Sequence, residues 1–164
     1  RSGFSDVPKK IILADALFGR VNWKYTTKKP ADNWYRPGFD VSAWKDGVGG
    51  FGSTGTPGVF LNTVWETSDI WLRREFTLEA EDIPKIKLHM FHDEDAEIYF
   101  NGVLAARLPG FVTDYDEFEI SQVALSALPP GENSIAVHCH QTTGGQGIDV
   151  GIVIPQLQEE NPKK

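Results

Sequence analysis

The sequence contains a single cysteine, Cys139, which excludes an internal disulfide bond and a cysteine-rich zinc site. No apolar run approaches the roughly 20 residues of a membrane helix. Basic residues are also scarce, because 16 Lys and Arg stand against 23 Asp and Glu and give a formal charge of −7. Phosphate backbones and anionic lipids repel a surface of this sign. We therefore expect neither nucleic acid nor a membrane as the main partner.

The length and composition of the chain suit one globular domain. The chain has 164 residues, of which 40% are hydrophobic and 24% charged, enough apolar surface for a core. We expect a single domain over residues 1–157, with 1–20 as a lead-in and 158–164 as a tail or linker stump. The chain begins with Arg1-Ser2 and no leader-like segment, which indicates a mature product or a piece of a longer protein.

The excess of negative charge lies in residues 93–119, where Arg107 is the only basic residue. We interpret this segment as a solvated or ion-binding edge of the fold. Its acidic residues are Asp93, Glu94, Asp95, Glu97, Asp114, Asp116, Glu117 and Glu119.

Alternation of apolar and polar residues predicts several half-buried strands separated by turns. Asn101-Gly102 favours a type I′ hairpin, because both residues tolerate positive φ. Helical signals are weak and cover only residues 11–18 and 121–128, about two turns each. The pattern indicates an all-β sandwich of about seven to nine strands. The predicted strands are residues 70–78, 86–90, 96–101, 103–107, 133–141 and 149–154.

The first third of the chain is rich in both turn residues and aromatic side chains. All five tryptophans lie before position 72: Trp23, Trp34, Trp44, Trp65 and Trp71. Long loops with large aromatic side chains either cover the core or present rings to a ligand.

A glycine-rich stretch, Gly50-Phe51-Gly52-Ser53-Thr54-Gly55, matches the letters of a dinucleotide-binding fingerprint. That motif needs a strand before it and a helix after it, whose N-terminus holds the pyrophosphate. Neither is predicted here, so we interpret the stretch as a surface loop.

Two groups of polar residues have the chemistry of a site. Residues 93–97 place three or more carboxylates beside His89 and His92, and residues two apart in a strand share a face. This arrangement leaves open acid-base catalysis, a cation or ligand contact, and a hydrogen-bonded turn. His138 and His140 also share a strand face, so they are candidates for a metal site, for polar ligand contacts or for structural hydrogen bonds. The glycine-rich loop after them leads to Asp149, at a candidate binding edge.

Three sequence blocks, in order and spacing, resemble the sugar-binding domain of glycoside hydrolase family 2, a jelly-roll module of the galactose-binding-like superfamily. Asp69–Phe76 is similar to that domain's strand with an aromatic residue, two basic residues and Phe. His92–Gly102 resembles its acidic hairpin strand ending in Asn-Gly, and Pro130–Val137 its Gly-x-Asn-x-Ile-Ala-Val strand opening. The segment Trp34–Trp44, in which Trp follows a Phe-Asp-x-Ser turn, and the earlier Trp23–Thr26 are also similar.

The resemblance implies a jelly-roll β-sandwich that serves as an accessory module of an extracellular or periplasmic carbohydrate-active enzyme. Catalysis in that family belongs to a separate barrel domain, so the resemblance implies no catalytic residues here. It also implies that Asp149 reaches toward a neighbouring active site, and it leaves a structural calcium ion open.

Our first hypothesis is therefore a non-catalytic carbohydrate-binding module, in which aromatic rings stack on a sugar and polar side chains bind its hydroxyls. The alternatives are a purely structural domain that packs against a catalytic neighbour of the same chain and, third, a small glycosidase that uses the acidic residues. The candidate stacking residues are Trp34, Tyr35 and Trp65, and the candidate polar contacts are Asp93, Asp95, His138, His140 and Asp149.

Overall fold

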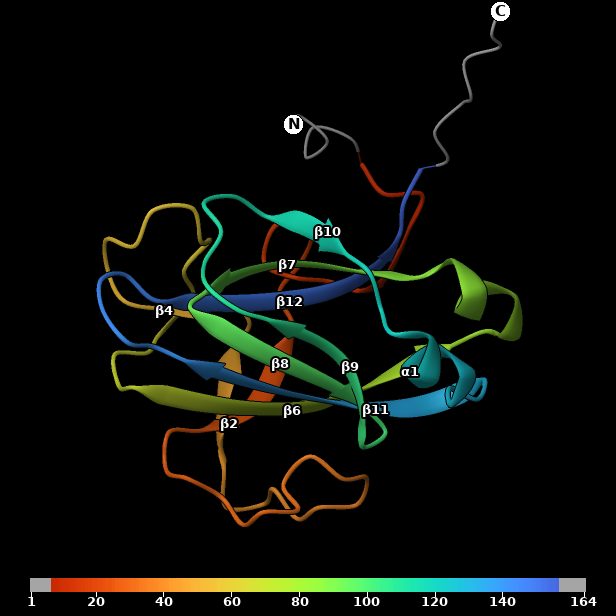
Figure 1. Ribbon diagram of the computed structural model, residues 1–164, viewed down its shortest axis with the longest axis horizontal. Coiled ribbons are helices and arrows are strands. Elements are labelled where there is room, and N and C mark those ends of the chain that lie inside the picture. Colours follow the sequence, from red (N-terminus) through yellow and green to blue (C-terminus); the bar gives the residue numbers. More distant parts are fainter. Residues whose placement is uncertain (1–6, 157–164) are drawn as a thin grey trace, which may run out of the picture.

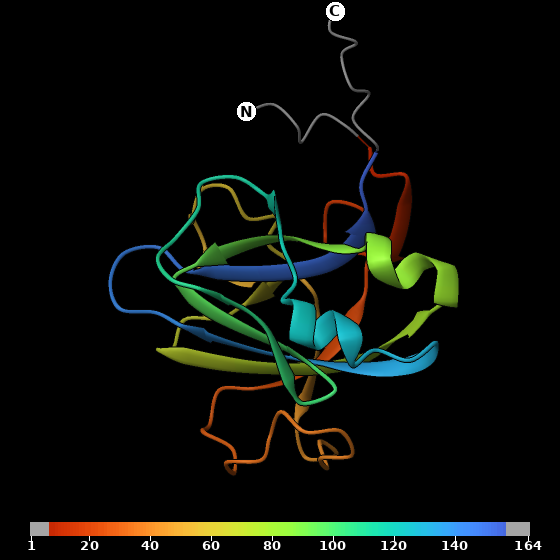
Figure 2. The ribbon, with the colours of Figure 1, turned by 45° about the vertical axis from the view of Figure 1, so that its right-hand side comes forward.

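The computed structural model describes residues 7–156, which form two sheets packed face to face (Figures 1 and 2). Sheet A has the order β10-β7-β12-β4-β5, with β1 also paired to β12, and sheet B has the order β3-β2-β6-β11-β8-β9. All pairings are antiparallel except that of β4 with β5. The predicted jelly-roll sandwich class is confirmed, with more strands than expected because several are only two to four residues long.

The strands of sheet A are β1 (Lys10–Leu13), β4 (Phe51–Gly52), β5 (Thr63–Val64), β7 (Lys87–Asp93), β10 (Asp116–Phe118) and β12 (Gly147–Ile154). Those of sheet B are β2 (Asn22–Thr26), β3 (Lys45–Val48), β6 (Asp69–Leu78), β8 (Asp95–Phe100), β9 (Val103–Leu108) and β11 (Gly131–His140). A 3-10 helix, η2 (Ala80–Lys85), and a helix, α1 (Gln122–Ser126), lie at one end of the sandwich (Figure 2). Within residues 7–156, no helix combines the length and the apolar composition that a membrane crossing requires.

The core lies between the sheets and is built by the alternating residues of the long strands. In β12, Ile148, Val150 and Ile152 face it, and in β11, Val137 and Cys139 do so. The residues between them therefore point to the outer faces of the two sheets. Burial raises the pKa of the Cys139 thiol, so this side chain is a neutral part of the core.

The local signals in the sequence account for most elements. Asn101 and Gly102 have φ values of 50° and 85°, which confirms the type I′ hairpin between β8 and β9. The short helix predicted within residues 121–128 is α1, and the Ser121 side chain caps it by accepting a hydrogen bond from the Ala124 amide.

Two expectations for the first third of the chain are wrong. Residues 10–13 are strand β1, not part of a helix, because they pair with β12 over Lys10–Ile154 and Ile11–Val153. The glycine-rich stretch is not wholly a surface loop, because Phe51 and Gly52 form the buried strand β4 beside β12.

Candidate functional site

The outer face of sheet B carries most of the predicted site, because the strand register aligns side chains from three strands. Strand β11 lies between β6 and β8. His138 stands opposite Trp71 on one side and Glu97 on the other, and in the next row His140 stands opposite Asp69 and Asp95. Residues directly opposite in antiparallel strands share a face. These groups, up to 71 positions apart in sequence, therefore form one surface.

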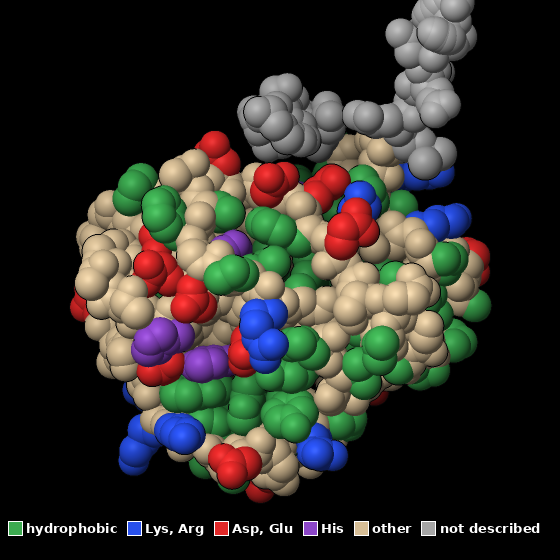
Figure 3. All heavy atoms as spheres, in the orientation of Figure 1, with side chains coloured by type: hydrophobic (Ala, Val, Ile, Leu, Met, Phe, Trp, Pro, Cys, Tyr) green, Lys and Arg blue, Asp and Glu red, His purple; other side chains and the backbone are tan. Residues whose placement is uncertain are grey.

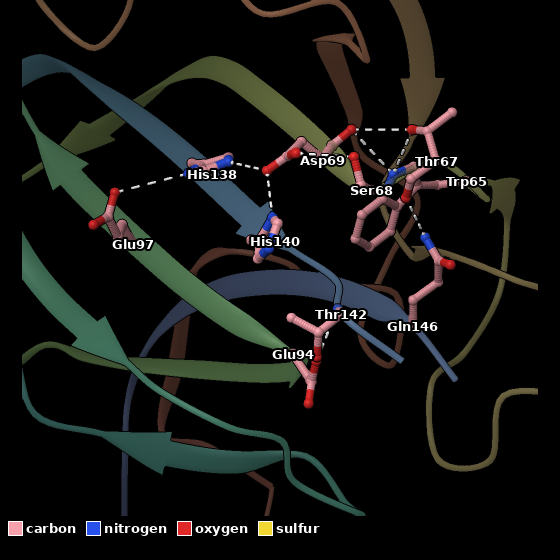
Figure 4. Close-up of polar contacts among 10 residues, drawn as sticks. All are labelled: Trp65, Thr67, Ser68, Asp69, Glu94, Glu97, His138, His140, Thr142 and Gln146. Carbon is pink, nitrogen blue, oxygen red and sulfur yellow. Dashed lines mark hydrogen bonds and ion pairs between the residues drawn. The ribbon is translucent and has the colours of Figure 1, made fainter. Parts of the chain in front are cut away.

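Asp69 joins the two histidines. Its Oδ1 atom lies 2.7 Å from His138 Nε2 and 2.9 Å from His140 Nδ1, and its Oδ2 atom accepts a hydrogen bond from Ser68 (Figure 4). Burial acts to raise the pKa of the Asp69 carboxyl, but the hydrogen bonds from both histidines outweigh it, so that the pKa is lowered. Asp69 is therefore an ionised acceptor at neutral pH, and each ring must donate an N–H to it.

A group of aromatic side chains lies next to the two histidines. The ring of His138 stacks on Trp71 with centroids 4.9 Å apart and an interplanar angle of 7°. Trp34 packs edge-on to Tyr99 at 5.8 Å, and Tyr35 lies against Tyr99 at 4.6 Å. Figure 3 shows the result as histidine side chains beside charged groups, with an apolar area directly below them. We call the surface formed by Tyr35, Tyr99, Asp69, His138 and His140 the aromatic–histidine face.

The loop that brings Trp34 and Tyr35 to this face, residues 27–44, lies below sheet B in Figure 1. Arg73 of β6 anchors it, because its Nη1 atom donates to the carbonyl oxygens of Trp34 at 2.6 Å and Arg36 at 3.0 Å. Asp40 stabilises a turn of the same loop by accepting from the Ser42 amide at 2.9 Å. The lengthy aromatic loop is therefore fixed on the sheet.

A pocket of about 250 Å³ opens next to the two histidines. Arg107 forms part of its wall and is bound to Glu97, whose Oε2 atom lies 3.0 Å from both Nε and Nη2 of the arginine. Glu97 Oε1 accepts from the Tyr99 hydroxyl at 3.3 Å. The remaining wall includes Asp95, Pro109, His138 and His140.

A larger hollow of about 830 Å³ lies elsewhere on sheet B, near β2 and the start of β11. Its basic side chains bind other parts of the protein: Lys24 pairs with Asp46 at 3.1 Å, Arg73 holds the loop of residues 27–44, and Arg74 donates to the Asn22 and Glu75 carbonyls. None of the residues predicted from the sequence lines it. We therefore place the candidate site at the smaller pocket, which His138 and His140 of the aromatic–histidine face line together with other hydrogen-bonding groups.

The other predicted residues lie away from this pocket. Trp65 is 1% exposed in the core, where its indole N–H lies 3.1 Å from Thr67 Oγ1 and 3.2 Å from the Asp69 carbonyl. A ring in that position has no face for a sugar, so its role is structural. Asp93 lies at the end of β7 in sheet A, where burial and then the neighbouring Glu94 raise its pKa to about 6.

Asp149 lies on the outer face of sheet A beneath loops that cover it. It accepts hydrogen bonds from the Tyr115 hydroxyl and from the Ala16 amide, the latter at 3.0 Å. Beside it, Asp15 contacts the ring of His89, and all of these side chains are buried. Burial, followed by the charge of Asp15, raises the pKa of Asp149 to about 7. This carboxyl binds loops to the sheet and is not open to a ligand.

In the turn between β7 and β8, the acidic side chains accept hydrogen bonds from backbone amides, and they are not arranged as a pair of catalytic carboxylates. Asp93 and Asp95 do not share one strand face, because the chain passes from β7 of sheet A to β8 of sheet B at Glu94. Glu94 accepts from the Thr142 amide at 2.9 Å, and Asp95 accepts from the Gly110 amide at 2.7 Å.

Over residues 7–156, no set of three His, Cys, Asp or Glu side chains has an arrangement suited to a metal ion. His138 and His140 do share a face, as the alternation predicted, and both rings donate to Asp69. Sequence reasoning missed Asp69, Glu97, Tyr99 and Arg73. The available signal was the alternation Asp69-x-Trp71-x-Arg73, which places three functional side chains on one face of β6.

Comparison with known proteins identifies the fold. A scan of protein-family models gives no match, and a search of curated proteins also gives none. Among solved structures, a glycosyl hydrolase family 2 member from Bacteroides cellulosilyticus superposes with a TM-score of 0.55 and 18% identity over 80% of this chain. A β-glycosidase from Bacteroides vulgatus gives 0.54 and 15% over 90%. A Ruminococcus gnavus β-glucuronidase, in complex with uronic isofagomine, gives 0.53 and 16% over 92%.

The match covers only one part of each of these enzymes: 20% of the first and second chains and 29% of the third. This chain therefore has the fold of a β-sandwich domain found in glycoside hydrolase family 2 enzymes, as the sequence blocks predicted. At these identities the likeness extends to the fold.

Proposed function

We propose that this chain is a non-catalytic, glycan-binding domain of a larger, secreted polysaccharide-degrading enzyme. The observation that carries the proposal is the aromatic–histidine face, where ring surfaces and hydrogen-bonding groups lie side by side and the two histidines line a pocket. A pyranose has an apolar face of C–H groups and a rim of hydroxyls. The aromatic rings of this surface can stack on the C–H face, and its hydrogen-bonding side chains can bind the hydroxyls.

Tyr35 is the main stacking residue in this proposal. It is partly exposed, whereas Trp34 is 9% exposed and lies beneath it in the aromatic cluster. Trp34 and Tyr99 support the Tyr35 ring at fixed angles, which lowers the entropy lost when a ligand binds. The polar contacts come from His140, which is 44% exposed, and from Asp95 and His138.

Two observations support a non-catalytic role. The carboxylates nearest the pocket are engaged, Glu97 with Arg107 and Asp95 with the Gly110 amide. The chain also corresponds to about a fifth of the solved glycoside hydrolases, so most of each enzyme lies outside the shared sandwich. A secreted enzyme would place this domain outside the cytoplasm, where polysaccharides occur.

The test is a glycan array followed by calorimetric titration of the oligosaccharides that bind. We expect Tyr35→Ala and His140→Ala to weaken binding at least about tenfold each, as loss of a central contact does. Phe60→Ala is the matched control, because Phe60 is 51% exposed on a loop outside the face. Absence of binding to every glycan at millimolar concentration would refute the proposal.

A second candidate function is docking to a catalytic neighbour of the same chain. Leu17 and Phe60 are 44% and 51% exposed, and their segments adjoin at Gly50, where an added Cβ would lie 3.3 Å from Ala16 and 2.2 Å from the Phe60 carbonyl oxygen. Exposed apolar side chains of this kind are typical of domain interfaces. In a longer protein that contains this chain, Leu17→Ser with Phe60→Ser should separate one calorimetric unfolding transition into two. An unchanged single transition would count against docking there.

A further inference from the structure

The polar side of the pocket consists almost wholly of hydrogen-bond acceptors. Asp69 is an ionised carboxylate that takes an N–H from His138 Nε2 and another from His140 Nδ1. In a neutral imidazole, donation by one nitrogen leaves the other as an acceptor. When each ring is neutral, His138 Nδ1 and His140 Nε2 are therefore the acceptors. His138 Nδ1 faces Glu97 Oε1 at 3.8 Å, and His140 Nε2 belongs to a side chain that is 44% exposed.

The charged residues of the pocket add further acceptors. Asp95 uses Oδ1 to bind the Gly110 amide, which leaves Oδ2 for a ligand. Among the described residues of the pocket wall, Arg107 is the one Lys or Arg side chain, and two of its nitrogens bind Glu97. This cation is thus already paired, while the nearby charges of Asp69 and Asp95 repel an anionic ligand. The Arg36 guanidinium, 5.6 Å from the centroid of the Tyr35 ring, lies outside the pocket wall.

A ligand that suits these groups must bring hydrogen-bond donors and no negative charge. We propose that the pocket beside the aromatic–histidine face selects neutral glycosyl units, whose hydroxyls donate to His140, His138 and Asp95, and rejects uronates. The proposal rests on the glycan-binding function proposed above and names its ligand class. A uronate replaces a donating C6 hydroxymethyl group by a carboxylate, which has acceptors only and the same charge as the pocket.

The experiment compares pairs of oligosaccharides that differ only at C6. Cellohexaose is paired with β-1,4-linked hexaglucuronate, and β-1,4-mannohexaose with hexamannuronate, each titrated at pH 8 and low ionic strength. For whichever of the two pairs the domain binds, we expect the neutral oligosaccharide to bind at least about tenfold more tightly than its uronate counterpart. Raising the salt to about 0.5 M should narrow this ratio, because salt screens the repulsion.

Glu97→Gln is the diagnostic variant. It removes a negative charge, can keep the hydrogen bond from the Tyr99 hydroxyl and releases Arg107 from its ion pair. We expect the neutral-to-uronate ratio to fall at least about threefold in this variant. Glu117→Gln on strand β10 of sheet A is the matched control and should leave the ratio unchanged. Thermal melts of both variants check that the fold is retained.

The outcomes separate this inference from the proposed function. Equal or tighter binding of uronates, on the matched pairs or across the glycan array, overturns the selectivity and leaves glycan binding in place. A ratio that Glu97→Gln does not change overturns the assignment of selectivity to this pocket. Absence of binding to neutral and uronate glycans alike overturns the glycan-binding function, and the selectivity with it.

Discussion

Replacement of Asp149 by Asn should remove a pH-dependent cost of folding, and the structure sets both its sign and its size. The carboxyl is 1% exposed, and burial together with the neighbouring Asp15 raises its pKa from 3.8 to about 7. A group with a raised pKa in the folded state stabilises the fold fully below its unfolded-state pKa. That stability is lost as the pH rises through the folded-state pKa.

The magnitude follows from the two pKa values. Full deprotonation of Asp149 costs about 4 kcal/mol of folding free energy, and about 2–3 kcal/mol of this falls between pH 5 and pH 8. An Asn side chain is an uncharged equivalent of the protonated carboxyl, and its oxygen can still accept from Tyr115 and Ala16. The stability of the Asp149→Asn variant relative to the wild type should therefore rise by about 2–3 kcal/mol from pH 5 to pH 8.

Urea unfolding of both proteins at pH 5, 6, 7 and 8 measures this difference, and titrating groups that do not interact with Asp149 cancel between the two. Asp116→Asn, an exposed acid on β10 of the same sheet, is the control and should show no such trend. A stability difference between wild type and Asp149→Asn that stays constant over this pH range would show that Asp149 does not titrate there. A difference that moves in the opposite direction would show that its pKa is lowered.

Three further changes test the fold and the support of the site. Trp65→Ala should lower the free energy of unfolding by about 3–5 kcal/mol, as measured in urea, because it empties a fully buried position in the core. Gly50→Ala should cost more than about 1 kcal/mol in the same assay, because Gly50 has a φ of 102° and an added Cβ would lie 2.2 Å from the Phe60 carbonyl oxygen. Arg73→Lys should weaken glycan binding in calorimetry with a smaller loss of stability, since a single ammonium cannot reproduce the fork that holds the Trp34 and Arg36 carbonyls. Unchanged affinity in Arg73→Lys would show that the loop keeps its place without this anchor.

The long strands were predictable because each one alternates between the core and an outer face. In β11, Val137 and Cys139 are buried while His138 and His140 point outward, and local alternation alone is enough to separate them. The hairpin at Asn101-Gly102 was predictable for a similar reason, since its backbone needs positive φ at two adjacent residues.

The errors arose where long-range pairing decides the structure. Residues 11–13 have apolar side chains that suit a helix or a strand, and pairing with β12 selects the strand. The sequence predicted a loop at Phe51 and Gly52 because glycine is common in turns. The glycine at 52 is needed because the Gln146 carbonyl oxygen would lie 2.6 Å from an added Cβ. Neither cause is visible in a local window of sequence.

The site shows the same division between local and long-range information. The shared face of His138 and His140 was predictable, whereas Asp69, which orients both rings, lies 69 positions away from the first and reaches it only through the β6–β11 register. Trp65 was placed among the ligand contacts for its residue type, and Asp149 for its position after a glycine-rich loop and for the family resemblance. Both side chains are 1% exposed, because loops and strands distant in the sequence cover them, and local sequence does not show this burial.

The protein uses the same pair of residue types, histidine with aspartate, on the outer faces of both sheets, and burial separates the two uses. On sheet A the His89–Asp15 contact is covered by loops. The two side chains therefore bind each other and hold those loops against β7 and β12. On sheet B the Asp69 carboxylate binds two rings whose outer nitrogens remain next to a pocket. A covered pair stabilises the fold, whereas an open pair with the same chemistry supplies oriented acceptors for a ligand. The loop that Arg73 holds on sheet B reaches His138 through the Trp34 ring, with centroids 6.3 Å apart, but contributes no residue to the wall of the pocket.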